Sequence, residues 1–569
     1  MSGRNPYLVN RAFRTFAVST ILAVMATSMG FFINGVIVGN MMGEQALSAV
    51  NLVSPLVQLF NAITALLCAG GATLCAVLIG KGKGKDTWGV FRSAMVIMGV
   101  ISAAMMAVGL FAPDMVASAI CSSDALLPMV EEYASIALIG SAAYLFMPGL
   151  AMFVRVDGSP NTATLALGTA NIAAPLLCVA LVGSGMGIAG ASAALVLGYA
   201  IGTVILVLHF FRNRGTSLFK PSSGAPGHIP ELLEYGAPIA LASVMMVVKM
   251  LVMNMLTLQY LGDGGMATMA LAMNTLMLAS MLIGGICQTI QPIGGTLYGS
   301  GDSEGISYLT RTVAVVLVAS LTILVVVVMA VPGLFCTLFG VTDPEIVDSS
   351  ITALRLFAPC ILLYGVNYAI MVLYQVLGHR HISIMVSVVQ PLCVIVTAFV
   401  LAPVDGELIW ASFWIGELVM LVIVALMSAV MRRRDSGLMG LLLGRVPSVP
   451  IESVSFSGDG SDIPSALEAV SSFLAEHGVD AAKASHIRLC CEELAVNVVE
   501  HGISRNPKRF ADMVVRIGDE VSVIIRDDGA LFNPIEYDGE GIGIMIAKGV
   551  CKDMTYTRAM GQNNVRVTF

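Results

Sequence analysis

The chain has 569 residues, of which 57% are hydrophobic and 12% are charged, and its formal net charge is −7. Soluble domains carry about 25% charged residues, so this composition argues against an ordinary soluble enzyme and indicates a multi-pass membrane protein. The net negative charge argues against nucleic acid as a partner.

Apolar runs of about 20 residues fill the chain up to residue 430 and stop after Arg432. Each run is long enough to cross the roughly 30 Å hydrocarbon layer of a bilayer as a helix. The sequence therefore predicts an α-helical polytopic membrane domain over residues 1–430. Twelve spans are predicted, at residues 14–39, 51–79, 89–111, 129–153, 161–183, 188–211, 235–261, 266–298, 308–333, 348–376, 383–403 and 407–430.

Basic residues gather in the loops on one side of these spans. Arg11 and Arg14 lie at the start of the first span, Lys81 and Lys83 follow the second, and Arg433 follows the last. The loops on the opposite side carry no Lys or Arg. Because basic loops stay on the cytoplasmic side, we expect a protein of the plasma membrane with both termini in the cytoplasm.

An internal repeat supports the count of twelve. Gly80 and Gly82, in LIGKGKG, recur 219 positions later as Gly299 and Gly301, in LYGSGDS. The segments VRVDG and YQVLG match at an offset of 220. An even number of spans between equivalent positions gives two six-helix lobes with the same orientation. The predicted halves are about residues 10–215 and 225–430.

Several segments of the membrane part resemble multidrug and toxic compound extrusion (MATE) transporters. They are FFINGVIVGNMMGEQALSAVNLVSPL (31–56), VRVDGSPNTATLALGTANI (154–172), GIAGASAALVLG (187–198) and EYGAPIAL (234–241). The resemblance covers roughly residues 10–430 and recurs in both halves. It implies two lobes around a central cavity, which exports small organic compounds in exchange for protons or sodium.

One position departs from the family pattern. Many bacterial members have an Asp in the first helix where this sequence has Asn34, and an amide takes up no proton at ordinary pH. Ionisable groups inside spans are costly and are functional candidates, here Lys249 and Glu417, as a pair or a titrating site. The candidates for the transport cavity are Asn34, Asn171, Lys249, Gln291, Asn367 and Glu417.

The periodicity changes after the last span. A basic linker over residues 431–448 precedes a domain at residues 449–569, whose pattern predicts an α/β layer with one core of its own. Strands are predicted at 449–458, in two runs within 511–529, at 554–558 and at 563–569, and helices at 463–478, 484–502 and 542–552.

The second of these helices carries the motif EELAVNVVEHG. Its spacing places Glu493, Asn497, Glu500 and His501 on one face. A polar face alone is more often simply solvated. Three glycine-containing segments downstream favour a functional site: RDDG with Asp527 and Gly529, GEGIGI with Gly541 and Gly543, and GQN with Gly561.

In this order and spacing the elements resemble the Bergerat-type ATP-binding fold, a two-layer α/β sandwich. They are most similar to anti-sigma-factor serine kinases, whose helix has a Glu four residues before an Asn and a His four residues after it. The resemblance implies ATP and Mg²⁺ as cofactors, bound by Asn497, His501, Asp527 and the glycines.

Physical roles follow for six of these residues. Asn497 offers an oxygen to Mg²⁺, which prefers oxygen ligands. Glu493 is the catalytic candidate, placed to accept a proton from an attacking hydroxyl or water. Asp527 is suited to accept a hydrogen bond from the adenine amino group. Gly529 lets the adenine ring approach the backbone, and Gly541 and Gly543 expose amides to phosphate at a helix N-terminus.

The sequence contains no Walker A motif and no phosphoacceptor-histidine helix. Two roles for the ATP domain stay open: a serine/threonine kinase acting on a partner such as an anti-anti-sigma (STAS-like) protein, or a nucleotide-sensing gate. For the whole chain, we expect a cation-coupled exporter regulated by this domain. The alternative is a membrane-tethered signalling kinase whose bundle is a sensor. A lipid-linked sugar flippase shares the architecture but should have more basic cavity residues than Lys249 alone.

Overall fold

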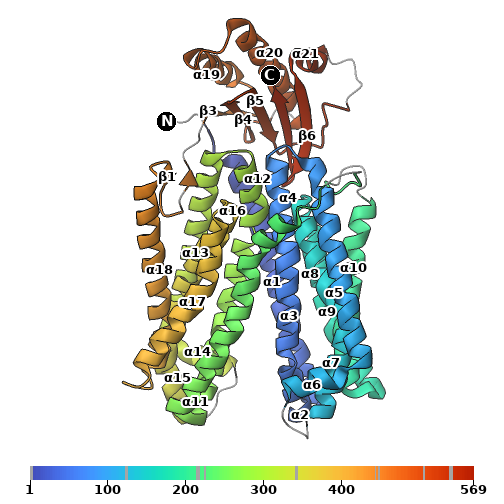
Figure 1. Ribbon diagram of the computed structural model, residues 1–569, viewed down its shortest axis with the longest axis vertical. Coiled ribbons are helices and arrows are strands. Elements are labelled where there is room, and N and C mark those ends of the chain that lie inside the picture. Colours follow the sequence, from blue (N-terminus) through green and yellow to red (C-terminus); the bar gives the residue numbers. More distant parts are fainter. Residues whose placement is uncertain are drawn as a thin grey trace.

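A bundle of long helices carries a smaller sheet domain at one end, and both chain termini lie at that end (Figure 1). The computed structural model describes residues 4–121, 126–212, 218–222, 226–339, 344–442, 444–445, 449–503, 506–536 and 542–569.

The first half of the bundle is built from helices that are apolar around most of their circumference, as expected for helices surrounded by lipid and other helices. They are α1 (Tyr7–Met42), α2 (Glu44–Leu52), α3 (Ser54–Thr64), α4 (Gly70–Gly80), α5 (Thr87–Phe111), α6 (Pro113–Ile120), α7 (Leu127–Ile139), α8 (Ser141–Val156), α9 (Pro160–Leu181) and α10 (Gly187–Arg212).

The second half repeats this order with similar lengths. Its helices are α11 (Ile229–Cys287), α12 (Ile290–Gly299), α13 (Ser303–Ala330), α14 (Pro332–Leu338), α15 (Pro344–Phe357), α16 (Pro359–Val376), α17 (Arg380–Leu401) and α18 (Leu408–Arg434). Helix α11 contains two spans, because the backbone breaks at Gly262, where φ is +65°.

Ten helices among the described residues are long and apolar enough to cross a membrane, and the bent pair α7 and α8 makes an eleventh. One of the ten, Pro160–Arg212, has 53 residues. As one straight helix it would measure roughly 80 Å, far more than a bilayer core. It breaks at Gly185, where φ is +92°, and α9 and α10 pack against each other. Counting both arms gives the twelve predicted spans.

The predicted repeat is visible in the backbone. Gly82 and Gly301 have φ values of +78° and +73°, and Gly158 and Gly378 both have +82°. L-residues avoid this left-handed region, so each half needs glycine at the same two turns. The turn after the second span and the turn after the fourth span therefore have the same conformation in both halves.

The two halves meet closely at the end that carries the sheet domain. A side chain on Gly80 of α4 would overlap the carbonyl of Thr296 of α12, and one on Gly299 would overlap the carbonyl of Val77. Small residues allow helices to pack at such short distances. The ribbons of α3 and α11 diverge toward the opposite end (Figure 1). The bundle is thus closed next to the sheet domain.

The sheet domain follows a short hairpin, β1 (Leu438–Met439) and β2 (Gly444–Arg445). Its five strands are antiparallel in the order β3-β4-β5-β7-β6. The strands are β3 (Ile451–Ser457), β4 (Phe510–Ile517), β5 (Val521–Asp527), β6 (Asp553–Ala559) and β7 (Gln562–Thr568). The helices are α19 (Ile463–Glu476), α20 (Ala481–Asn497), which continues as a π-helical turn to Gly502, and α21 (Ile542–Val550).

Strand periodicity gives this sheet two different faces. Apolar side chains such as Met513, Val523 and Val565 form a buried core with α19 and α20. The alternate positions carry polar side chains, including Asp512 and Arg526, and this face lies toward the bundle (Figure 1). The sheet therefore separates its own helices from the membrane helices.

Candidate functional site

The second half of the bundle contains a buried polar cluster around Glu417 of α18. Glu417 is fully buried, and its carboxylate accepts hydrogen bonds from Nδ2 of Asn367 at 2.7 Å and Nε2 of Gln390 at 2.9 Å. Among the described span residues, no other acidic side chain is buried. Three helices, α16, α17 and α18, thus converge on one carboxylate. Gln390 was not among the predicted residues, although an amide inside an apolar run signals such a role.

Lys249 of α11 is buried near this cluster, and no ion pair joins it to Glu417 among the described residues. Its ammonium lies over the ring of Tyr364, 5.4 Å from the centroid, in a cation–π contact. The structure therefore brings Lys249, Asn367 and Glu417 into one region of the second half.

The candidates in the first half carry no charge. Asn34 is 2% exposed, and its Oδ1 has no hydrogen-bond partner among the described residues. Asn171 donates from Nδ2 to the carbonyl of Leu167 at 2.8 Å and lies against Gly30, where a side chain would overlap its amide. Asn34 thus has a buried amide oxygen without a partner in the described part of the chain, whereas Asn171 contributes to helix packing.

Gln291 of α12 contacts another amide of the second half, on α16. Its Nε2 is 3.5 Å from Oε1 of Gln375. Arg155 of α8, in the first half, is buried and donates from Nη1 to Oε1 of Gln288, in the second half, at 2.7 Å. The contact of Arg155 with Gln288 joins the first half to the second.

The nucleotide candidates gather between α20 and the end of β5. Asp527 is 3% exposed and accepts hydrogen bonds from Nδ2 of Asn563 at 2.9 Å and from the amide of Gly529 at 2.8 Å. Burial raises the pKa of Asp527 to about 6, because the low-dielectric surroundings disfavour the charged form. Asn563 was not predicted as a site residue, although it is the last residue of the GQN segment.

Glu493 and Asn497 lie one turn apart on α20, as predicted. Nδ2 of Asn497 donates to the carbonyl of Glu493 at 3.0 Å, which leaves Oδ1 as the atom that a cation would meet. His501 falls in the π-helical turn, and its ring stacks on Phe532 with 5.9 Å between centroids. Glu492, the first residue of the EELAVNVVEHG motif, is exposed, whereas Glu493 is half-buried.

Two of the predicted glycines lie where a side chain would not fit. A side chain on Gly529 would overlap the carbonyl of Gly502, so Gly529 lets β5 approach the end of α20. A side chain on Gly543 would overlap the carboxylate of Glu493, which lies against the first turn of α21. A carboxylate is favoured at a helix N-terminus for the same reason as a phosphate. Gly541 lies outside the described residues.

The pocket between these groups is small, at about 20 Å³, and it is lined by Asn497, Asp527, Phe532 and Asn563 among others. That volume holds about one water molecule. The residues that would hold adenine and Mg²⁺ are thus together, with Phe532 packed beside them.

The polar face of the sheet binds the turn between α12 and α13. Asp302, at the start of α13, accepts hydrogen bonds from Arg526 of β5 at 2.6 Å and from Arg4 at 2.9 Å. Arg4 also pairs with Asp512 of β4 at 2.9 Å. Burial raises the pKa of Asp302, but the two guanidinium groups outweigh burial and hold the pKa at about 2.

Equivalent turns of both halves contact arginines of this face. An added Cβ would lie 3.2 Å from Nη1 of Arg566 at Gly82, and 3.3 Å from Nη1 of Arg516 at Gly301. Arg566 also donates to the carbonyl of Lys81 at 2.9 Å. The sheet therefore bridges the two repeats at the end where the bundle is closed.

The start of α1 completes this contact. Asp528, the residue after β5, accepts a hydrogen bond from the hydroxyl of Tyr7 at 3.1 Å and forms an ion pair with Arg11. Gln562 donates to the carbonyl of Leu8 at 3.0 Å, and Met560 is buried against the core of the bundle. We call the contacts of Asp302, Arg526, Asp528 and Arg566 with their partners the docking contacts.

Comparison with known families agrees with both parts of the fold. The MatE family model matches residues 19–180 and 238–400, together more than half of the chain. The two segments are displaced by 219 to 220 residues, the offset of the internal repeat. The family model described as Histidine kinase-like ATPase domain matches residues 456–569.

Individual relatives are distant. The Multidrug export protein MepA of Staphylococcus haemolyticus is 22% identical over 422 residues, which span 72% of this chain and 91% of that protein. Similar solved structures include a MOP superfamily transporter from Pyrococcus furiosus and an outward-facing multidrug resistance MATE family transporter. Each has a TM-score of 0.69 and 20% identity, and each match covers 76% of this chain and 96% of the other.

The structural similarity establishes the fold of the bundle. The extent of the family match establishes that the chain belongs to the MatE family. The chain is a multi-pass membrane protein of the MatE family, with a Histidine kinase-like ATPase domain at its C-terminal end.

Proposed function

We propose that this protein exports small organic compounds across the plasma membrane by cation antiport, and that its ATPase-like domain binds Mg-ATP and regulates export. The basic loops lie at the end that carries this domain, which supports cytoplasmic termini. The relative named as a multidrug export protein is matched over 91% of its length, which supports export.

Glu417 is the group best suited to couple transport to protons or sodium. A fully buried carboxylate inside a span costs several kcal/mol, and two amides are placed to stabilise its charge. A proton or a sodium ion would neutralise it. The position with an Asp in many relatives is Asn34 here, so coupling in this chain uses the second half.

The residues around Asp527 fit Mg-ATP. Asn497 presents its Oδ1 to Mg²⁺, the carboxylate of Asp527 accepts from the adenine amino group, and the first turn of α21 favours phosphate. Bound ATP supplies charge and binding energy, and the protein residues position it. The small pocket means that Phe532 and the side chain of Glu493 must move when the nucleotide enters.

One observation carries the proposal of regulation: three consecutive residues at the end of β5 face three different partners. Asp527 lies in the nucleotide pocket, Arg526 binds Asp302 between α12 and α13, and Asp528 binds the start of α1. A shift of this strand end on nucleotide binding therefore acts on the transporter directly. Strand periodicity makes this possible, because neighbouring residues point to opposite faces.

The conformation of the bundle and the domain indicates whether ATP promotes or inhibits opening of the cytoplasmic side. The docking contacts bridge both halves where α4 and α12 are closed, and the nucleotide pocket is small in the same structure. A domain whose nucleotide pocket is this small thus holds the cytoplasmic side closed. Mg-ATP, by moving the end of β5, weakens the docking contacts and allows that side to open.

Proteoliposomes with an imposed proton or sodium gradient test this proposal, with a fluorescent organic cation as the probe and Mg-ATP added on the domain's side. Efflux that depends on the gradient and rises with Mg-ATP in wild type, but not in Asn497→Ala, is expected. Absence of efflux of a broad panel under both gradients would exclude export. Efflux that is indifferent to nucleotide would exclude regulation.

A kinase role is the second candidate. The helices α19, α20 and α21 face away from the bundle, so a partner protein can reach the nucleotide pocket (Figure 1). Glu493, one turn from Asn497, is placed to act as the base. Transfer of phosphate from radiolabelled ATP to a STAS-like protein, lost in Glu493→Gln, is the measurement that decides between a kinase and a sensor.

A further inference from the structure

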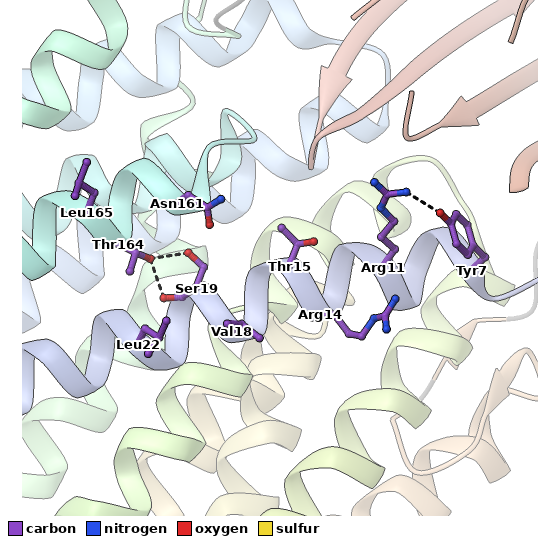
Figure 2. A pocket seen from close by; sticks show the side chains of 10 residues that line it. All are labelled: Tyr7, Arg11, Arg14, Thr15, Val18, Ser19, Leu22, Asn161, Thr164 and Leu165. Carbon is purple, nitrogen blue, oxygen red and sulfur yellow. Dashed lines mark hydrogen bonds between the residues drawn. The ribbon is translucent and has the colours of Figure 1, made fainter. Parts of the chain in front are cut away.

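A groove of about 830 Å³ runs along the side of the bundle between α1 and α9 (Figure 2). It lies outside the buried cluster around Glu417 and the pocket around Asp527, and it shares Tyr7 and Arg11 with the docking contacts. Its volume falls within the range of ligand pockets. Its lining consists of Tyr7, Arg11, Arg14, Thr15, Val18, Ser19, Leu22, Asn161, Thr164 and Leu165.

The chemistry of the lining changes along the groove. Arg11 and Arg14 lie at the end nearer the strands, and Leu22 and Leu165 lie at the other end (Figure 2). Leu22 is 53% exposed and Leu165 is 63% exposed. Between the two ends, the hydroxyl groups of Ser19 and Thr164 are 2.6 Å apart. The groove is therefore cationic, then polar, then apolar over about three turns of α1.

We propose that this groove binds an anionic glycerophospholipid, with its phosphate at Arg11 and Arg14 and an acyl chain along Val18, Leu22 and Leu165. The basic end lies in the first two turns of α1, beside the sheet domain. Anionic headgroups of the cytoplasmic leaflet reach this level, and each nearby basic residue attracts them. The polar middle faces the glycerol and ester groups.

Charge decides between occupants. The guanidinium group of Arg14, which has no carboxylate partner in the described part of the chain, repels the organic cations expected as export substrates, and the exposed leucines give a small free anion nothing to contact. A lipid satisfies both ends. Arg14 has no ion pair or hydrogen bond within the described part of the chain, so its guanidinium is available to a phosphate.

Arg11 links this site to the ATPase-like domain. Its guanidinium donates to the hydroxyl of Tyr7 at 2.6 Å and forms an ion pair with Asp528, which follows Asp527 directly. A lipid phosphate competes with Asp528 for the same guanidinium. Anionic lipid therefore weakens one docking contact and favours the nucleotide-bound domain. This consequence rests on the proposed function, whereas lipid binding itself does not.

Lipid binding is tested on the full chain by native mass spectrometry in detergent, with phosphatidylglycerol or phosphatidylcholine added. Wild type is expected to retain phosphatidylglycerol in preference, and the double variant R11Q/R14Q to lose that preference. Arg433→Gln is the matched control, since Arg433 is exposed at the same end of the bundle. Equal retention by R11Q/R14Q and Arg433→Gln overturns the site and leaves non-specific surface lipid only.

The link to nucleotide is tested by Mg-ATP affinity in nanodiscs of the two lipids. Phosphatidylglycerol is expected to tighten binding by about two- to fivefold in wild type, the size of a partly exposed ion pair, and to have no effect in Asp528→Asn. An equal effect in both proteins overturns the link. Failure of wild type to bind ATP contradicts the proposed function, while the lipid retention result still decides the groove.

Discussion

Arg526, the residue before the buried Asp527 of the proposed nucleotide pocket, donates to the carboxylate of Asp302 in the transporter at 2.6 Å, and both side chains are buried. They are 224 residues apart in the chain. A buried ion pair of this kind is costly to break from one side, because the remaining charge loses its partner. The contact therefore fixes the sheet domain to the second half of the bundle.

Removing the charge of Asp302 is expected to loosen the domain. Asp302→Asn leaves Arg526 buried without its carboxylate partner, while Arg4 keeps Asp512, so the free energy of unfolding should fall by about 3 kcal/mol. Mg-ATP affinity should rise several-fold, since docking and nucleotide binding oppose each other. Thermal unfolding and isothermal titration of the full chain measure both effects.

The matched control for that experiment is Glu520→Gln, which removes an exposed ion pair with Lys552 on the same domain. It should change neither quantity appreciably. If Asp302→Asn loses stability with unchanged ATP affinity, docking does not oppose nucleotide binding.

Neutralising Glu417 should uncouple transport. Glu417→Gln keeps the shape and the hydrogen bonds with Asn367 and Gln390 but cannot take up a proton, so gradient-driven efflux should drop by roughly tenfold or more. Substrate binding, followed by fluorescence quenching, should persist. Glu345→Gln, an exposed acid at the start of α15, serves as control. Wild-type efflux in Glu417→Gln would place coupling elsewhere.

Asn497 is expected to account for the dependence of ATP binding on magnesium. Asn497→Ala removes the oxygen available to the cation, and the loss should weaken Mg-ATP binding about 10- to 100-fold, as for a hydrogen bond to a charged group. Affinity for ATP in the presence of EDTA should differ little between the two proteins. Equal affinity of both proteins for Mg-ATP would contradict a cation at this residue.

Phe532 should oppose nucleotide entry, because its ring lines a pocket of about 20 Å³. Phe532→Ala is expected to tighten ATP binding a few-fold, as measured by fluorescence titration with a labelled nucleotide. Leu531→Ala, which changes an exposed neighbour, provides the comparison. Weaker binding in Phe532→Ala would mean that the ring stacks on the base.

The raised pKa of Asp527, about 6, predicts a pH dependence of stability. The folded protein holds this proton more tightly than the unfolded chain, whose Asp has a pKa near 3.9. The contribution of Asp527 to the free energy of unfolding is therefore fully present below pH 4. It is lost as the pH rises to 6, a decline of up to about 3 kcal/mol. Asp527→Asn should remove that decline. Denaturant unfolding between pH 4 and pH 7 checks the difference between the proteins.

Much of the architecture follows from local patterns. Apolar run lengths predict the spans, and the glycines at a fixed offset predict the repeated turns, because only glycine adopts positive φ without strain. The i, i+4 spacing identifies Glu493 and Asn497 on one face of α20. These features depend on residues within one or two turns of each other, which is the range over which sequence dictates geometry.

Local sequence patterns could not predict contacts between residues that are far apart in the chain. The sequence does not reveal that Gln390 joins Asn367 at Glu417, that Lys249 lies over Tyr364, or that Arg155 is buried between the halves. The polar face of the sheet reads as a solvated surface, yet it is buried against the bundle.

The sequence by itself determined twelve apolar spans in two repeats, a separate α/β domain, and the residue types of a nucleotide pocket. Only the tertiary structure decided that Arg526, Asp527 and Asp528 join that pocket to the transporter. The reason is physical: burial periodicity is written locally in each helix and strand, whereas an ion pair between residues hundreds of positions apart forms only when folded surfaces of opposite charge meet.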